Sequence, residues 1–366
     1  MTLELLQGSV AITRAAIAAG CRFFAGYPMS PFTPLLEAMS RELGAAGGVC
    51  INAESEIEGA NMVLGAAAAG ARAATGSCGQ GIALMQETIA EAALNETPFV
   101  VFDMARNQQD YFQCTRGGGW GDYRTITLAP KDIPEAVEHT QLLFHLADLH
   151  RAPTILYGDP LLAQTLVGVE VTELDFGPLP PKDWALDGSA SGTGRSRQVW
   201  TWAMGKANDP GPGPDAHWRR VAGKFDQIAR TEARHEEIHV DDAEVLVVAF
   251  GSAAKFVEHV VTDLRKEGHR VGLFRPITLW PFPGDALARA SRGVRRVLVF
   301  EINAGQMLDD VRMHVHDRET VEFIGGVSID ESGLGFGPLL DAPVVAERIL
   351  RAGGTVGTGQ AVPVRG

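Results

Sequence analysis

The sequence predicts an α/β protein with two doubly wound parallel sheets, and three features of the 366-residue chain support this fold class. Short, continuous apolar runs such as 99–102 and 245–250 are typical of strands buried on both faces of a parallel sheet. These runs alternate with segments of helical periodicity. A Pro/Gly-rich segment at 166–240 separates two such alternations, so we expect domains at 1–165 and 241–366 joined by a wrapping linker.

The first predicted domain begins with an Ala/Ile-rich helix from about residue 9 to Gly20, where glycine is a natural C-terminal cap. A short strand at 22–25 leads into a loop that contains Ser30. The next helix is expected to have Thr33 as its N-cap and Pro34 at its first position, where a missing N–H is tolerated. This assignment leaves Ser30 outside the helix, beyond the end of a strand.

The remaining elements of the first domain follow from the same alternation. We expect a strand at 49–53, a small-residue helix at 55–70, a strand at 72–75, a turn flanked by Gly76, Gly79 and Gly81 that opens a helix through Leu94, and strands at 99–102 and 154–157.

The linker and the second domain contain further expected elements. The linker holds Trp184, Trp200, Trp202 and Trp218, so it is expected to pack against other parts of the protein, and its segment Lys224–His239 is expected to be a charged helix. Strands are predicted at 245–250, 271–274, 297–302 and 321–324, with helices between them and a final helix at 343–351.

Composition excludes several classes of function. The net charge of −13 and the lack of a basic run argue against nucleic-acid binding. The longest apolar stretch, 63–71, is too short to span a membrane, and residues 1–8 do not resemble a signal peptide. The four cysteines form no C-x-x-C pair, and no histidine pair has a ligand at metal-binding spacing, so we expect no metal or iron–sulfur site in this chain and a reducing, cytoplasmic location.

Ligands of open parallel sheets bind beyond the carboxyl ends of the strands, which directs attention to Glu56 and Arg106. Carboxylates at 54, 56 and 58 complement a helix dipole, but helical geometry separates Glu56 from the other two and points it among small neighbours. Arg106 follows a buried strand, where it can form a structural ion pair or clamp a substrate carboxylate. The glycine-rich loop at 117–123 lacks a phosphate-binding pattern and is a weak candidate.

Eight strings around these positions resemble those of one family. They are Ala19–Pro28, Ala53–Glu56, Asn61–Arg72, Gly81–Glu87, Asp110–Gln113, Gly117–Tyr123, Arg275–Pro283 and Glu301–Met307. The chain is similar, nearly end to end, to the α subunit of 2-oxoacid:ferredoxin oxidoreductases, most closely the 2-oxoisovalerate (branched-chain) type.

The resemblance implies that 1–165 is a thiamine-diphosphate pyrimidine-side domain and that 241–366 is a transketolase C-terminal-like domain. It further implies a β-type partner subunit that carries the diphosphate and Mg²⁺ site and the cysteines of a 4Fe–4S cluster, with γ and δ subunits and ferredoxin as other partners. The expected reaction is oxidative decarboxylation of a 2-oxo acid to an acyl-CoA, with coenzyme A as co-substrate.

The resemblance also implies roles for individual residues. Glu56 aligns with the glutamate that bonds N1′ of the pyrimidine, where it promotes the tautomer that removes the C2 proton. Arg106 aligns with an arginine near the substrate carboxylate, and Ser30 stands where the family usually has a substrate-contacting threonine. Further cofactor contacts are implied at Tyr27, Pro28, Gly79 and Gly81.

One departure from the family pattern leaves two alternatives open. The family has a Gly-Gly-Pro-rich loop after its arginine, whereas here only residues 107–109 separate Arg106 from Asp110. Loops at such a position commonly gate substrates. A non-redox decarboxylase or carboligase that uses the same cofactor is therefore one alternative, and a non-catalytic scaffold subunit is the other.

Overall fold

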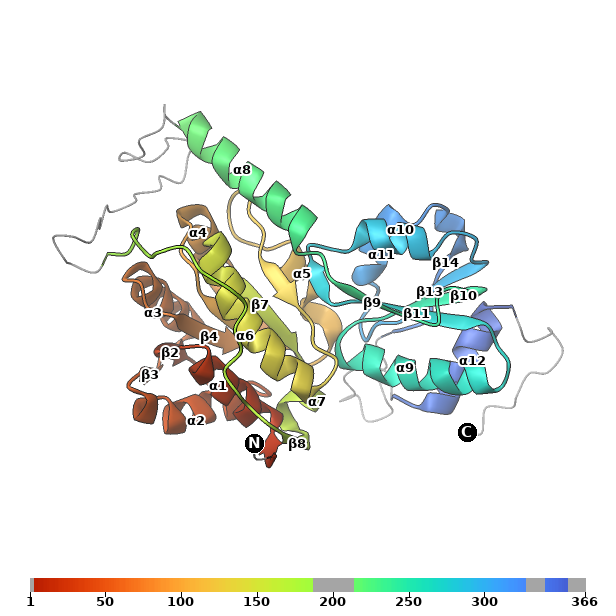
Figure 1. Cartoon of the computed structure of the whole chain (residues 1–366), viewed down its shortest axis with the longest axis horizontal. Coiled ribbons are helices and arrows are strands. Elements are labelled where there is room, and N and C mark those ends of the chain that lie inside the picture. The colour runs from red at the N-terminus through yellow and green to blue at the C-terminus, as the bar shows by residue number, and fades with distance from the viewer. Residues whose placement is uncertain (1–2, 187–213, 327–339, 355–366) are drawn as a thin grey trace. The chain divides into compact units, whose positions relative to one another are not determined.

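The structure is a computed structural model that describes residues 3–186, 214–326 and 340–354, and these form two compact units (Figure 1). The first unit comprises Met1–Ala233 with Thr278–Phe282, and the second comprises Arg234–Ile277 with Pro283–Gly366. Each is built on a largely parallel sheet with helices, so the α/β fold class is confirmed. Trp200 and Trp202 of the expected linker lie outside the described residues.

The first unit contains a seven-stranded sheet with strand order β12-β6-β7-β5-β4-β2-β3. Its strands are β2 (Phe23–Gly26), β3 (Val49–Asn52), β4 (Ala73–Ser77), β5 (Val100–Met104), β6 (Ile126–Leu128), β7 (Thr154–Gly158) and β12 (Thr278–Trp280). All pairings are parallel except that of the edge strand β12 with β6. Strands β4, β5 and β7 are buried throughout, as their apolar sequences predict.

Helices of this unit cover both faces of the sheet. They are α1 (Gly8–Ala18), α2 (Thr33–Glu42), α3 (Glu56–Ala68), α4 (Gln80–Asn95), α5 (Tyr111–Thr115), α6 (Ile133–His150) and α7 (Pro160–Gln164). Right-handed crossovers that run in opposite directions along the sheet place α2 and α6 on one face and α3 and α4 on the other. The packing agrees, because α1 contacts α2 and α6, whereas α3 contacts α4.

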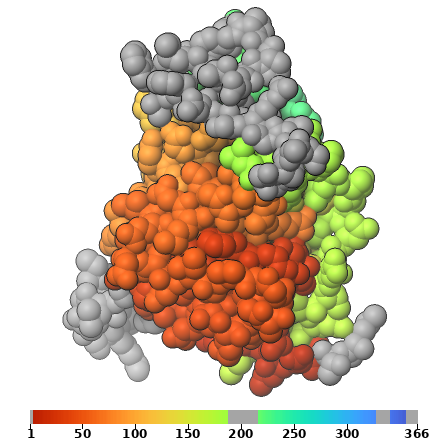
Figure 2. Space-filling view, turned by 90° about the vertical axis from the view of Figure 1, so that its left-hand side faces the viewer, coloured from red at the N-terminus to blue at the C-terminus, as the bar shows by residue number. Residues whose placement is uncertain are grey.

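The strand order reverses between β2 and β4. From β2 the chain runs outward to β3 and then returns to β4 on the opposite side of β2. The loops that leave β2 and β4 therefore diverge, and in open α/β sheets ligands bind at such a point. Figure 2 views the first unit from the side where its N-terminal residues, coloured red to orange, are exposed.

The boundary of α2 differs slightly from the prediction. Thr33 is the first residue of the helix and not its N-cap, a position that Phe32 occupies without a side-chain cap. Pro34 still lies in the first turn, where no intrahelical N–H bond is lost. Ser30 lies in the loop, as expected.

The helix predicted at 224–239 is wrong in its position. Helix α8 spans Pro214–Thr231, and the following residues form strand β9 (His235–Ile238), which pairs antiparallel with β11 (Val271–Pro276). The reason is tertiary, because buried Arg275 donates to the Glu236 carboxylate at 2.8 Å, and the His235 ring stacks on Phe274. This pairing outweighs the local helical preference of a charged segment.

Two tryptophans of the expected linker pack against the first unit. The Arg151 guanidinium lies 5.1 Å from the Trp184 ring centroid, and the rings of Trp218 and Trp120 meet edge to face at 6.2 Å. The expected packing is thus confirmed for these two residues. Strand β8 (Leu166–Val169) pairs with β1 (Glu4–Gln7) in a separate antiparallel ribbon.

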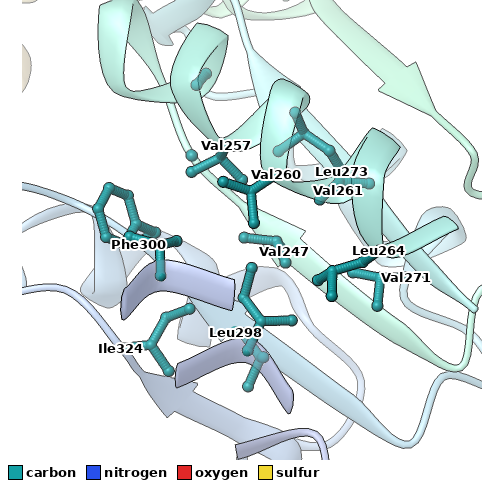
Figure 3. Packing of buried hydrophobic residues seen from close by; sticks show 14 of the residues in the cluster. Val247, Val257, Val260, Val261, Leu264, Val271, Leu273, Leu298, Phe300 and Ile324 are labelled. Atoms are coloured by element: carbon teal, nitrogen blue, oxygen red, sulfur yellow. The ribbon is translucent and has the colours of Figure 1, made fainter. Parts of the chain in front are cut away.

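The second unit contains a five-stranded sheet with order β14-β13-β10-β11-β9. Its other elements are β10 (Val245–Val248), α9 (Gly251–Lys266), α10 (Gly284–Ala290), β13 (Arg296–Val299), α11 (Met307–His314), β14 (Val321–Phe323) and α12 (Ala342–Ala352). Figure 3 shows Val257, Val260 and Leu264 of α9 directed at the apolar side chains of the strands, among them Val247 and Leu298.

Candidate functional site

The Glu56 carboxyl is buried in the first turn of α3, beside the end of β4. Glu56 is 4% exposed, and the Ser77 hydroxyl donates to its Oε1 at 3.2 Å. Ser55, the N-cap of α3, accepts the N–H of Glu58 and so fixes this turn. Glu54 and Glu58 remain exposed. Of the three clustered carboxyl groups, the capped turn thus buries only that of Glu56.

Gly81 faces this carboxyl from the first turn of α4. A Cβ atom at position 81 would collide with the Ser77 hydroxyl and lie 2.5 Å from Glu56 Oε1, so only glycine fits. Among the residues that the structure describes, none donates a hydrogen bond to Glu56 Oε2. A carboxyl with one oxygen fixed by a hydroxyl and the other open suits a ring nitrogen that exchanges a proton. These residues fit the aminopyrimidine ring of thiamine diphosphate.

Arg106 lies just beyond β5, and its guanidinium reaches the start of α4. Nη1 donates to Gln80 Oε1 at 2.7 Å, and Nη2 lies 3.2 Å from Met29 Sδ. A Cβ atom at Gly79 would lie 2.8 Å from Nη1, so the guanidinium packs on that glycine. Within the described residues no carboxylate forms an ion pair with Arg106. This arrangement argues against the structural ion pair and favours a carboxylate clamp.

The loop after β2 brings Tyr27, Pro28 and Ser30 to the same edge of the sheet, and all three are exposed. Burial raises the pKa of the Cys78 thiol to about 12, and this neutral thiol donates to the backbone oxygen of Ser30 at 3.2 Å. The end of β4 thus holds the loop that carries Ser30.

The connection that follows Arg106 is short and ordered. Asn107 Oδ1 accepts the N–H of Gln109 at 3.0 Å, which forms a tight turn. Asp110, at the end of this turn, accepts the N–H of Gly79 through Oδ2 at 2.7 Å. Arg106 and Asp110 therefore both contact the turn that begins α4.

The glycine-rich loop uses its amide groups internally. The Tyr123 hydroxyl accepts the N–H groups of Gly118 and Gly119 at 3.1 and 3.0 Å and donates to Gln86 Oε1 at 3.2 Å. These amides are not available to a phosphate, so the structure argues against a phosphate cradle here.

The structure brings the predicted residues Glu56, Gly79, Gly81 and Arg106 together around the start of α4, next to the loop of Ser30. Sequence reasoning assigned no role to Ser77, Gln80 or Asp110. For Ser77 the available signal was its place at the end of a buried strand; for Asp110 it was the polar run after Arg106.

Two further absences concern only the part of the chain that the structure describes. No group of three or more histidine, cysteine, aspartate or glutamate residues there could hold a metal ion. No helix there is long and apolar enough to cross a membrane.

Comparison with known proteins identifies both units. Residues 14–183 match the family described as "Pyruvate flavodoxin/ferredoxin oxidoreductase, thiamine diP-bdg", and residues 243–331 match "Pyruvate:ferredoxin oxidoreductase core domain II". The first of these is a thiamine-diphosphate-binding domain.

Two curated relatives and one solved structure show how far the similarity extends. A ketoisovalerate oxidoreductase subunit VorB from Methanothermobacter thermautotrophicus is 35% identical, covering 90% of this chain and 95% of that protein. A 2-oxoglutarate synthase subunit KorA from Methanocaldococcus jannaschii is 34% identical, covering 89% and 96%. The structure of a 2-oxoglutarate:ferredoxin oxidoreductase from Magnetococcus marinus, with 2-oxoglutarate, coenzyme A and succinyl-CoA bound, shares the fold with a TM-score of 0.80 at 24% identity, over 96% of this chain and 65% of that one.

The chain therefore belongs to the 2-oxoacid:ferredoxin oxidoreductase family, among the subunits that carry the thiamine-diphosphate-binding domain.

Proposed function

We propose that this chain is the pyrimidine-side subunit of a thiamine-diphosphate-dependent 2-oxoacid:ferredoxin oxidoreductase. The complex would convert a 2-oxo acid and coenzyme A to an acyl-CoA, releasing CO₂ and passing an electron pair to iron–sulfur clusters in a partner. The observation that carries the proposal is the buried Glu56 carboxyl at the point where the strand order reverses: its Oε1 accepts from Ser77 beside Gly81, and its Oε2 takes no hydrogen bond from the described residues. The relatives named above support it.

Glu56 would act on the cofactor as a proton relay. Bound thiamine diphosphate supplies the electron sink for decarboxylation. Glu56 Oε2 would hold and return a proton at the pyrimidine nitrogen, while Ser77 keeps the other oxygen in place. Burial of the carboxyl excludes water from this proton transfer. The ring would also contact Gly79 and Gly81 of the α4 turn, with Tyr27 and Pro28 of the loop after β2.

Arg106 and Ser30 would bind the substrate. The guanidinium of Arg106 is held by Gln80 and forms no direct ion pair with a carboxylate of the described residues, so it can pair with the carboxylate of a 2-oxo acid. Ser30 would donate its hydroxyl from the exposed loop. The named relatives use a branched-chain and a dicarboxylic 2-oxo acid, so both classes should be assayed.

A partner subunit would complete the site. The described residues contain no metal-ligand cluster and no glycine-rich loop with free amides, so the diphosphate, Mg²⁺ and 4Fe–4S cluster would be held by a β-type partner. That partner could contact exposed apolar side chains on the two helices that begin at the site. These are Ile57 and Met62 on α3 and Leu84 on α4. Further γ and δ subunits and ferredoxin would complete the electron path. Four free cysteines favour the reducing cytoplasm as the location.

The test is a matched pair of substitutions in the complex purified with its native partner. Glu56→Gln should retain folding and partner binding but lose at least about 100-fold in 2-oxo-acid-dependent ferredoxin reduction, because an amide cannot relay the proton. Glu54→Gln, an exposed neighbour, should retain wild-type turnover. Circular dichroism and co-purification of the partner serve as controls for folding.

Each other outcome has a definite meaning. Wild-type turnover in Glu56→Gln would contradict the proton-relay role and support the scaffold alternative. An active complex that releases an aldehyde or a carboligation product, reduces no ferredoxin and needs no coenzyme A would support the non-redox alternative.

A further inference from the structure

Behind the turn that begins α4, two aspartate side chains share a buried site. Asp103, on β5, is fully buried, and its Oδ2 accepts the thiol hydrogen of Cys114 at 3.2 Å. Asp110 is 5% exposed, and its Oδ2 accepts the N–H of Gly79 at 2.7 Å. The two carboxyl groups face each other closely enough for the charge of Asp110 to raise the pKa of Asp103. Since a carboxylate cannot donate, the two groups can bond each other only if one of them carries a proton.

The remaining partners indicate which aspartate carries the proton. Oδ1 of Asp103 is buried and has no donor among the described residues, so an ionised Asp103 would leave this oxygen unsatisfied. Asp110, in contrast, has a backbone donor and faces the positive charge of Arg106. Burial and the neighbouring Asp110 raise the pKa of Asp103 well above its usual range. A neutral Asp103 whose Oδ1 carries the proton would avoid a buried charge and could donate to an ionised Asp110.

The other titratable groups around the pair do not change this assignment. Cys114 on α5, Tyr157 on β7 and Cys78 just after β4 face it, and burial raises the pKa of each, which keeps the two thiols and the phenol neutral. Arg106, on the loop after β5, is the cation that faces Asp110. The pair therefore carries a single negative charge, and this charge lies on the Gly79 side.

We propose that Asp103 and Asp110 share one proton and that ionised Asp110 is a positioning residue, which holds Arg106 and the start of α4 in place for the 2-oxo acid by bonding the Gly79 amide. The inference rests on the proposed function for its substrate. Gly79 links Asp110 to Arg106 because the Arg106 guanidinium packs on this glycine. The backbone of Gly79 has φ 52°, a conformation that favours glycine. The next residue, Gln80, binds that guanidinium directly, and Gly81 faces Glu56.

The kinetic test compares two substitutions of Asp110 with an exposed control. In Asp110→Ala the Gly79 amide loses its acceptor, and the KM for the 2-oxo acid should rise about tenfold with a smaller change in kcat. In Asp110→Asn the side-chain oxygen still accepts from Gly79, so most of the affinity should return. Asp122→Asn, in the exposed glycine-rich loop, should leave both constants unchanged. An unchanged KM in Asp110→Ala would overturn the positioning role.

The pH profile separates positioning from a general loss of structure. Burial raises the pKa of Asp110 above its ordinary value, so the wild-type KM should rise as the pH falls through that raised pKa, since a neutral carboxyl is a weaker acceptor for the Gly79 amide. Asp110→Asn should abolish this rise. Asp103→Asn should move it to lower pH, because the new amide donates to Asp110 and stabilises its charge. Unchanged profiles in both variants would overturn the shared proton.

Two measurements on the full-length chain keep this inference independent of turnover. The infrared band of a protonated carboxylic acid at neutral pH should weaken in Asp103→Asn and persist in Asp122→Asn. Amide hydrogen exchange at Gly79 should accelerate in Asp110→Ala and return toward wild type in Asp110→Asn. If the wild-type complex turned over no 2-oxo acid, the proposed function would fail, whereas these two signals would still decide the proton sharing and the hold on Gly79.

Discussion

At the scale of single residues, the position within one helical turn determines which carboxyl can act. Glu54, Glu56 and Glu58 have the same side chain within five positions, yet only Glu56 is buried. Glu58 takes part in the N-terminal cap, since its N–H bonds Ser55 and its Oε2 accepts the N–H of Glu54. The capping residues thus occupy the solvent side and leave Glu56 to face Ser77.

A prediction at this scale concerns Arg106. Replacement by alanine should raise the KM for the 2-oxo acid about 10- to 100-fold, because a charge-assisted hydrogen bond is worth about 1.5–3 kcal/mol. Arg106→Lys should recover only part of this, since an ammonium group cannot bind a carboxylate through two parallel bonds. Initial-rate kinetics measure the effect, with exposed Arg124→Ala as control. A wild-type KM in Arg106→Ala would rule out the clamp.

At the scale of elements, the site depends on how closely α4 approaches the end of β4 and the start of α3. The approach is possible because the first turn of α4 presents Gly81 where any side chain would meet Ser77 and Glu56. The conformational entropy that a glycine costs on folding is the condition for this close approach.

Gly81→Ala tests this close approach against a control in the neighbouring helix. The added methyl group should displace Ser77 and the Glu56 carboxyl and lower thiamine-diphosphate affinity and turnover by at least about tenfold. Gly65→Ala, within α3, meets no atom within 4 Å and should be neutral or stabilise the chain by about 0.5–1 kcal/mol. Calorimetric cofactor titration and thermal unfolding measure the two effects. Equal cofactor affinity in both variants would contradict the proposed geometry.

The elements that the sequence predicts correctly are those with strong local signals. Apolar strands and the helix expected at 55–70 depend on adjacent residues, and they appear close to their expected places. Strands β9 and β12 could not be predicted, because each is an edge strand defined by a partner far along the chain. The predicted elements do not include helix α6, although Asp132 and Pro134 mark its start.

The candidate site divides in the same way. Its strand-end positions, Glu56 and Arg106 among them, follow from the general rule for parallel sheets. The contacts between them do not, because Glu56 meets Ser77 from 21 positions away and Asp110 meets Gly79 from 31. Such pairs are set by the packing of helices on the sheet, which no local pattern records.

At the scale of the whole molecule, the two units have separate cores, and the residues of the candidate site all belong to the first. The core of the second unit surrounds Leu298, which is fully buried in β13 beneath α9. Destabilising this core should therefore leave the first unit folded.

Leu298→Ala tests this independence. The cavity should cost the second unit about 2–5 kcal/mol and reduce the hydrogen-exchange protection of β10, β11 and β13. Protection of β4 and β5 should not change. Met313→Ala, at a residue 55% exposed, is the matched control. Loss of protection in β4 and β5 as well would mean that both units unfold together.

The path of the chain between the two units has a practical consequence for dissecting the protein. The chain leaves the first unit after Ala233, returns at Thr278 and departs again after Phe282, so β12 reaches the seven-stranded sheet only after β9, β10 and β11 have formed part of the other. Truncation at Ala233 would remove β12 from the outer side of β6 and leave an unpaired edge prone to aggregation. A soluble fragment for cofactor titration needs residues 278–282 restored, either as a separate peptide or by circular permutation.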